Sequence, residues 1–179
     1  MNLVTVLLPK NHRHIFLLLV LTSITSPIAA DVFVAGLNAI DRSHYASAYR
    51  SFKPLAEKGI SEAQNNLGFL YENGLGVKRN YSVAIKWYEQ AAEQGLPEAQ
   101  HNLGMLNYQG HGLSQSFSIA RRWFNRSAKQ ELRESHYMLG LMFFQGEGVQ
   151  KSSTRASDHF STAAKNGDPN ALYMLAHMM

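Results

Sequence analysis

The feature that most constrains this chain is a repeat of 36 residues, which occurs three times in succession without insertion or deletion. A Leu-Gly pair marks the period at residues 67–68, 103–104 and 139–140. A fixed period in the range of roughly 20–50 residues is typical of solenoids, whose units cannot bury their apolar faces alone and do so by stacking. The period therefore predicts a binding scaffold rather than an enzyme with a single pocket.

Each unit has the pattern of two antiparallel helices. In the first unit, Ser61 is the expected N-cap of the first helix, and Gly74 stands where a helix ends in a left-handed residue. Asn80 is the expected N-cap of the second helix. Ser116 and Ser152 occupy the same position in the other two units, so the same start signal recurs.

The second helix of each unit carries a large side chain that is expected to fill the core between helices. In the first unit, Trp87 or the adjacent Tyr88 is expected to fill it. Trp123 takes the position of Trp87 in the second unit, and His159 takes it in the third. A polar ring at a core position fills it less well, so the third unit is expected to pack less tightly.

The 36-residue spacing of equivalent residues extends beyond the three full repeats and adds a half repeat at each end of the region after residue 30. The repeats are 61–96, 97–132 and 133–168, and the half repeats are 42–59 and 169–179. The first half repeat is predicted to be a lone helix of the second type, meaning one equivalent to the second helix of a repeat, and it contains Pro54. The last half repeat is predicted to be a lone helix of the first type, equivalent to the first helix of a repeat. A terminal half repeat should shield the last apolar face, and residues 175–179 are so apolar that this end is predicted either to dock on something or to mark a shortened array.

Residues 1–30 have the composition of a secretory signal peptide. They contain no acid, carry Lys10 and Arg13, continue into an apolar run at 15–21, and end in small residues. Cleavage is predicted after Ala30, which would place residues 31–179 in the periplasm or outside the cell. An uncleaved inner-membrane anchor and a buried N-terminal helix are the alternatives.

Charge and cysteine content exclude several classes of protein. Loss of two basic residues with the leader lowers the formal net charge from +4 to 4 − 2 = +2, so nucleic acid is not an expected partner. The chain has no cysteine, which excludes disulfides and thiol chemistry. Stability must then come from stacking of the repeats.

The repeat motif of the first unit is A-x-x-x-L-G-x-x-Y-x-x-G-x-G-V over 63–77, followed by A-x-x-W-Y-x-x-A-A-x-x-G over 84–95. This motif resembles that of the Sel1-like repeat (SLR) family, a branch of the tetratricopeptide-like proteins. The resemblance covers residues 42–179 and implies an all-α fold, a right-handed superhelical solenoid of antiparallel helix pairs. It also implies a role as an adaptor for protein complexes, and many bacterial members are exported.

Two departures from the family pattern matter. Gly95 and Gly167 have Glu131 as their equivalent, which is expected to lengthen the helix or strain that loop. A cysteine-rich branch of the family binds β-lactam-like compounds, and the absence of cysteine argues against membership of that branch.

The histidines and the basic residues offer no firm site. His101 and His136 are the only pair worth considering for a metal, but they lie at different phases and are interpreted, like the other histidines, as solvated surface residues. Arg122, Arg126 and Lys129 follow one helical face, which is interpreted as a solvated outer surface with an acidic partner as the alternative.

The predicted function is that of an exported, non-enzymatic scaffold for protein–protein interaction in the bacterial envelope, without catalytic residues, cofactor or metal. Its binding residues are predicted on the first helices: Asn66, Asn102, Tyr108 and Phe144. Exposed aromatic and amide side chains there would anchor a partner protein of unknown identity. The alternatives are binding or hydrolysis of a cell-wall-related small molecule, such as a β-lactam or a peptidoglycan fragment, and self-association through the C-terminal half repeat.

Overall fold

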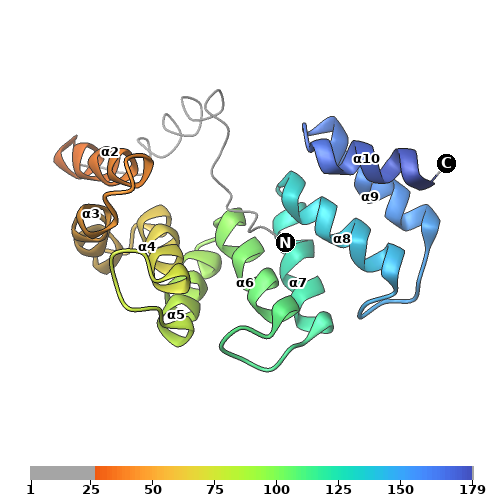
Figure 1. The fold of residues 1–179 in the computed structure, drawn as a ribbon, viewed down its shortest axis with the longest axis horizontal. Coiled ribbons are helices and arrows are strands. Elements are labelled where there is room, and N and C mark those ends of the chain that lie inside the picture. The colour runs from red at the N-terminus through yellow and green to blue at the C-terminus, as the bar shows by residue number, and fades with distance from the viewer. Residues whose placement is uncertain (1–26, 179) are drawn as a thin grey trace. The chain divides into compact units, whose positions relative to one another are not determined.

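The structure is a computed structural model that describes residues 27–178, and every regular element in that range is an α-helix (Figure 1). The helices are α2 (Pro27–Asp41), α3 (Tyr45–Glu57), α4 (Ser61–Asn73), α5 (Tyr81–Glu93), α6 (Pro97–Gln109), α7 (Phe117–Ala128), α8 (Arg133–Gln145), α9 (Ser153–Lys165) and α10 (Pro169–Met178). The all-α prediction is thereby confirmed. The chain divides within α5, between Trp87 and Tyr88, into two compact units that are described separately.

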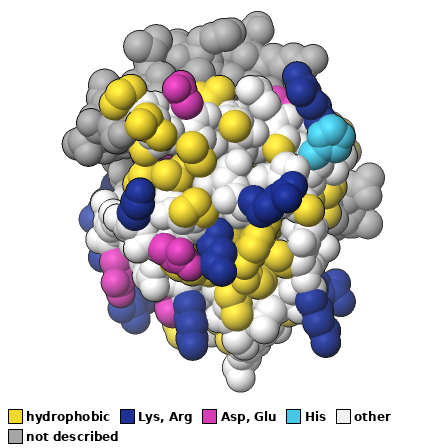
Figure 2. All heavy atoms as spheres, turned by 90° about the vertical axis from the view of Figure 1, so that its left-hand side faces the viewer, with side chains coloured by type: hydrophobic (Ala, Val, Ile, Leu, Met, Phe, Trp, Pro, Cys, Tyr) yellow, Lys and Arg dark blue, Asp and Glu magenta, His cyan; other side chains and the backbone are white. Residues whose placement is uncertain are grey.

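The first unit is built on α2, α3 and α4, which pack in chain order. Its core centres on Phe33, Phe52, Leu67 and Leu70, all of which are almost wholly buried. Figure 2 looks onto this unit, whose lysines and arginines are spread among hydrophobic side chains rather than gathered in one patch.

Helix α2 is not predicted by the 36-residue period, and it changes the interpretation of residues 42–59. Helix α3 is not a lone helix, because it packs against α2 as the second member of a hairpin. A Cβ atom built on Gly36 would lie 2.6 Å from the ring of Phe52, so this glycine lets the two helices approach closely. The glycine and the ring are 52 − 36 = 16 residues apart, against 124 − 104 = 20 in a full repeat, which puts α2 out of phase with the repeats.

The second unit packs α6 through α10 in sequential order, with α6 against α7, α8 against α9, and α10 against α9. The same close approach recurs in both full hairpins. A Cβ on Gly104 would lie 2.5 Å from the Phe124 ring, and one on Gly140 would lie 2.6 Å from the Phe160 ring. Only glycine leaves room for the ring at these positions, which explains why the Leu-Gly pair marks the period.

Of the two adjacent positions expected to fill the core, the second is the fully buried one. Tyr88, Phe124 and Phe160 are 0% exposed, whereas the preceding Trp87 and Trp123 are half-buried. The assignment of Trp87 and its equivalents to the buried site was therefore wrong, and that of Tyr88 is confirmed. The helix pair completely encloses the tyrosine or phenylalanine ring, which is smaller than the indole ring of tryptophan.

Most of the predicted helix ends are confirmed. The side chain of Asn80 accepts a hydrogen bond from the Val83 amide at 3.1 Å, and Ser116 and Ser152 cap their helices in the same way. Gly74 ends α4 in the left-handed region with φ of 69°. Ser61 is not a cap, since it is the first residue of α4 and Ile60 precedes it without a side-chain hydrogen bond.

The predicted leader lies largely outside the described residues, since these begin at Pro27. The predicted cut after Ala30 falls inside α2, whose first four residues precede it. Among residues 27–178, no helix is long and apolar enough to cross a membrane.

Candidate partner-binding surface

Tyr108 lies in the last turn of α6, where neighbouring residues hold it in one position. Its hydroxyl donates to the Glu147 carboxylate at 2.5 Å, and its ring meets Phe117 edge to face with centroids 5.3 Å apart. Burial and the bond to Glu147 both raise the pKa of the Tyr108 hydroxyl. The side chain is half-buried, so part of the ring remains accessible at a fixed orientation.

Phe144 occupies the equivalent position of α8, 36 residues further on, and is also half-buried. The ammonium of Lys151 lies 5.7 Å from the centre of its ring, within the range of a cation–π contact. Tyr108 also lies within hydrogen-bonding distance of Gln145, the neighbour of Phe144, at 3.4 Å. The ends of α6 and α8 therefore bring these two aromatic residues to the same side of the second unit.

The two predicted amide residues are less available. Asn66 belongs to the first unit, is half-buried, and donates its amide N–H to the Glu62 carbonyl of its own helix at 2.8 Å. Asn102 is half-buried in the second unit and is also engaged in an interaction. Tyr108 and Phe144 occupy equivalent positions of α6 and α8 in the second unit, whereas the two asparagines are divided between the units.

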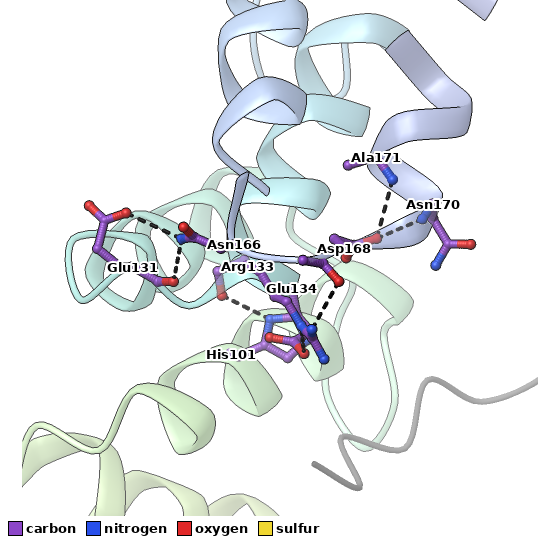
Figure 3. A network of polar contacts seen from close by, with 10 residues as sticks. His101, Glu131, Arg133, Glu134, Asn166, Asp168, Asn170 and Ala171 are labelled. Carbon is purple, nitrogen blue, oxygen red and sulfur yellow. Dashed lines mark hydrogen bonds and ion pairs between the residues drawn. The ribbon is translucent and has the colours of Figure 1, made fainter. Parts of the chain in front are cut away.

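His101 is buried, contrary to the expectation that it is a solvated surface residue. It is 3% exposed, and its ring lies 5.4 Å from that of Phe124. Its Nδ1 is 2.9 Å from the Ser135 hydroxyl, which donates to Ser127 at 2.8 Å, and Ser127 in turn donates to the Pro97 carbonyl at 2.8 Å. Figure 3 shows His101 in this part of the second unit.

This chain of bonds determines where the His101 proton lies. The Pro97 carbonyl can only accept, so Ser127 and then Ser135 each use their single hydroxyl proton in the direction of that carbonyl. Ser135 must then accept a hydrogen bond from Nδ1–H of a neutral His101. Burial agrees with the neutral form, because it lowers the pKa of His101 from 6.5 to about 4.

His136 pairs with His159 and not with His101. The two Nδ1 atoms are 3.2 Å apart, and Nε2 of His136 is 3.1 Å from the Ala128 carbonyl. The His159 ring also stacks on Phe143 with an interplanar angle of 10°. Burial and the neighbouring His136 lower the pKa of His159. The histidine that meets His136 is therefore His159, which the sequence analysis did not pair with it; the sequence signal that would have found this pair is its position on the two helices of one hairpin.

Metal ligands do not converge within residues 27–178, where no group of three or more histidines and acidic residues could hold an ion. The basic residues Arg122, Arg126 and Lys129 are exposed on α7 and just beyond it. The Arg126 guanidinium lies 5.0 Å from the centre of the Trp123 ring, which ties one of these charges to its own helix.

Helices packed in sequential pairs, with a glycine on one helix admitting an aromatic ring from the next, define a helical-repeat scaffold. The Sel1 repeat family model matches residues 61–96, 97–132 and 133–168, which together make up more than half of the 179-residue chain. The chain belongs to the Sel1 repeat family.

Several solved structures resemble this one. A protective antigen of uropathogenic Escherichia coli with an SLR fold is 32% identical with a TM-score of 0.77, and the match covers 84% of this chain and 33% of the antigen. A Sel1 repeat protein from Oxalobacter formigenes is 31% identical with a TM-score of 0.73, over 80% of this chain and 59% of that one. This chain therefore spans about a third and three-fifths of their lengths.

A more distant structure is the cysteine-rich protein B of Helicobacter pylori. It is 19% identical with a TM-score of 0.55, over 84% of this chain and 98% of that one. At this level of identity, the similarity shows the fold alone. A search of the curated proteins found no match.

Proposed function

We propose that the protein is an exported, non-enzymatic scaffold that binds another protein in the bacterial envelope through the first helices of its second unit. The observation that carries this proposal is the pair Tyr108 and Phe144, two half-buried aromatic side chains at equivalent ends of α6 and α8. Rigid aromatic side chains provide a large contact area and lose little rotamer entropy on binding.

The contacts around these rings support their role as anchors. Phe117 and Glu147 hold Tyr108, and Lys151 lies over Phe144, so the rings are oriented before a partner arrives. Preorganisation of this kind reduces the free-energy cost of binding. Asn102 lies six residues before Tyr108 on α6 and is proposed to border the same surface, whereas Asn66 lies in the other unit and would contact the partner separately.

Export of the chain is supported by the leader-like residues 1–30 and by the description of the similar E. coli protein as a protective antigen. The proposal expects a processed chain that begins at Asp31. Mass spectrometry of the protein from a periplasmic fraction tests the cut, and an intact N-terminus at Met1 in a membrane fraction would support an anchor instead.

Cross-linking in the native envelope followed by mass spectrometry tests the binding surface. Tyr108→Ala combined with Phe144→Ala is expected to reduce recovery of the cross-linked partner by about tenfold, as expected for the loss of two anchors. The matched control is Arg122→Glu with Arg126→Glu, which changes exposed charges on α7 and should leave recovery unchanged. Circular dichroism shows that both variants remain helical, and loss of the partner only in the control would move the site to the basic face.

A further inference from the structure

The two complete hairpins of the second unit show what covers the forward face of a first-type helix, meaning the face that it turns toward the next helix in the chain. On α6, His101 and Gly104 meet Phe124 of α7. On α8, Tyr137 and Gly140 meet Phe160 of α9, with ring centroids of Tyr137 and Phe160 5.7 Å apart. In both cases, the covering element is an amphipathic helix that presents a phenylalanine.

Helix α10 has the same forward face, but in the described part of the chain it is open to solvent. Tyr173 follows Tyr137 by 36 residues, and Ala176 follows Gly140 by the same interval. Tyr173 is 70% exposed and the adjacent Leu172 is 60% exposed, while Ala176 is exposed as well. The equivalents of Leu172 on α6 and α8 are polar, Gln100 and His136, so this face is more apolar than the covered faces that precede it.

Ala176 changes what this face can accept. A Cβ at the equivalent Gly104 or Gly140 would lie only 2.5 or 2.6 Å from the phenylalanine ring, closer than real carbon atoms approach. A helix that carries phenylalanine at this point cannot sit on α10 at the usual depth. A narrower aliphatic side chain such as leucine leaves room for the Ala176 methyl group and still covers Tyr173.

We propose that the forward face of α10, formed by Leu172, Tyr173 and Ala176, binds an amphipathic helix of a partner protein whose central contact residue is aliphatic rather than aromatic. Exposed apolar side chains in a row on one helix face are a common mark of an interaction site. The helix would occupy the place that α7 takes on α6 and that α9 takes on α8. This end surface is separate from Tyr108 and Phe144, so the proposal does not depend on the function proposed above.

A peptide taken from the chain itself provides the probe, because residues 144–168 contain the connecting turn and the whole of α9. A cross-link between the exposed positions Thr154 and Asp158 keeps the isolated peptide helical. One version has Phe160→Leu and the other retains Phe160. Fluorescence anisotropy of each labelled peptide, titrated with the full chain, measures its affinity.

The leucine peptide is expected to bind more tightly than the phenylalanine peptide, and Ala176→Gly in the protein is expected to reverse this order. Leu172→Asp with Tyr173→Asp should weaken binding of the leucine peptide by about tenfold or more, as expected for the loss of two apolar contacts. Lys129→Asp, an exposed change just beyond the end of α7, serves as the control and should leave the affinity unchanged. Circular dichroism confirms that each variant is folded.

Three results would overturn the proposal. The first is the absence of saturable binding of the leucine peptide to the native chain, and the second is the same order of the two peptides with Ala176 and with glycine at that position. The third is sedimentation that shows dimers dispersed by Tyr173→Asp, which would identify a second copy of the chain as the occupant of this face.

Discussion

Two structurally equivalent interfaces of the second unit differ in the chemistry of three equivalent buried positions. The first lies among α6, α7 and α8, and the second among α8, α9 and α10. Three positions separated by 36 residues distinguish them: His101, Ser127 and Ser135 in the first, and Tyr137, Ala163 and Ala171 in the second. The serines and alanines are all 0% exposed, so the helices pack equally closely around polar and apolar side chains.

The difference shows what allows polar groups into a repeat core. Each hydroxyl of the first interface donates to the next acceptor, and the series ends on the Pro97 carbonyl, so no member of it is left without a partner. At the three equivalent positions the second interface needs no such bonds, because an alanine methyl group has no hydrogen-bonding requirement; its polar contact between α8 and α9 is the separate His136–His159 pair. In the polar interface, each of the three residues is hydrogen-bonded to another of the three, so replacing one of them leaves a neighbour without a partner. In the apolar interface, each residue packs without such bonds and can be replaced independently of the others.

The largest expected effect comes from removing the aromatic ring that each interface encloses. Phe124→Ala and Phe160→Ala should each lower the free energy of unfolding by about 3–5 kcal/mol, because both rings are fully buried. Both α7 and α9 pack between two helices, but α10, which covers α9, leaves Leu172 and Tyr173 exposed, so Phe124→Ala should lie at the upper end of the range. Urea denaturation measures both losses, and a larger loss for Phe160 would mean that the C-terminal interface is the stronger one.

The polar interface should make the protein sensitive to acid. Burial lowers the pKa of His101 from 6.5 to about 4, so the unfolded chain takes up a proton before the folded chain does. The stability that depends on neutral His101 is present above about pH 6.5 and is lost as the pH falls toward 4, a change of about 3 kcal/mol. Denaturation at a series of pH values measures this loss.

The second interface supplies the control for the pH series. A variant with His101→Tyr, Ser127→Ala and Ser135→Ala has the apolar residues of the equivalent positions and should lose most of the decline between pH 6.5 and 4. A smaller decline should persist, because burial and His136 also lower the pKa of His159. An unchanged pH profile in the triple variant would show that His101 is not the group responsible.

Breaking the hydrogen-bond series at one member should cost less than removing a core ring. Ser135→Ala leaves His101 Nδ1 without its acceptor and Ser127 without its donor, which is expected to lower the free energy of unfolding by about 1–3 kcal/mol. Ala171→Ser makes the reverse change in the apolar interface and should cost a similar amount, since the new hydroxyl is buried. Thermal denaturation of both variants checks this, and a neutral Ser135→Ala would show that the bonds contribute little.

The smallest effect is expected in the loops that lead into the two interfaces. Glu131, before α8, has φ of 61°, whereas its equivalent before α10 is Gly167 with φ of 86°. Asn166 donates to the Glu131 carbonyl at 2.9 Å and lies 3.3 Å from its carboxylate, which holds the loop in place (Figure 3). The prediction that Glu131 strains this loop therefore agrees with its left-handed backbone.

Glu131→Gly should relieve this backbone strain and raise the free energy of unfolding by about 0.5–1 kcal/mol, reduced in part by the greater freedom of glycine in the unfolded chain. Gly167→Glu is the matched reverse change and should destabilise by a similar amount. Chemical denaturation measures both, and a loss of stability in Glu131→Gly would mean that the carboxylate contact with Asn166 outweighs the strain.

The repeat itself could be predicted from the sequence because it depends on local requirements. Gly74 and Asn80 end and begin helices by their own backbone preferences, and Gly104 and Gly140 recur because a Cβ there would collide with a ring. These requirements repeat every 36 residues and can be seen without knowledge of the packing. Helix α2 was not predicted, because its connection to α3 is shorter than the equivalent connection in the full repeats and shifts its residues out of the 36-residue spacing.

The pattern of residues by itself determined the helix pairs, their boundaries and the family, since periodic glycines, caps and apolar positions act within one unit. Only the tertiary structure decided which side chains of different helices meet. It buried His101 instead of leaving it at the surface, paired His136 with His159, and placed Tyr108 against Glu147. The physical reason is that hydrogen bonds and burial depend on distances between neighbouring helices, and a one-dimensional period contains no information about the direction in which each side chain points.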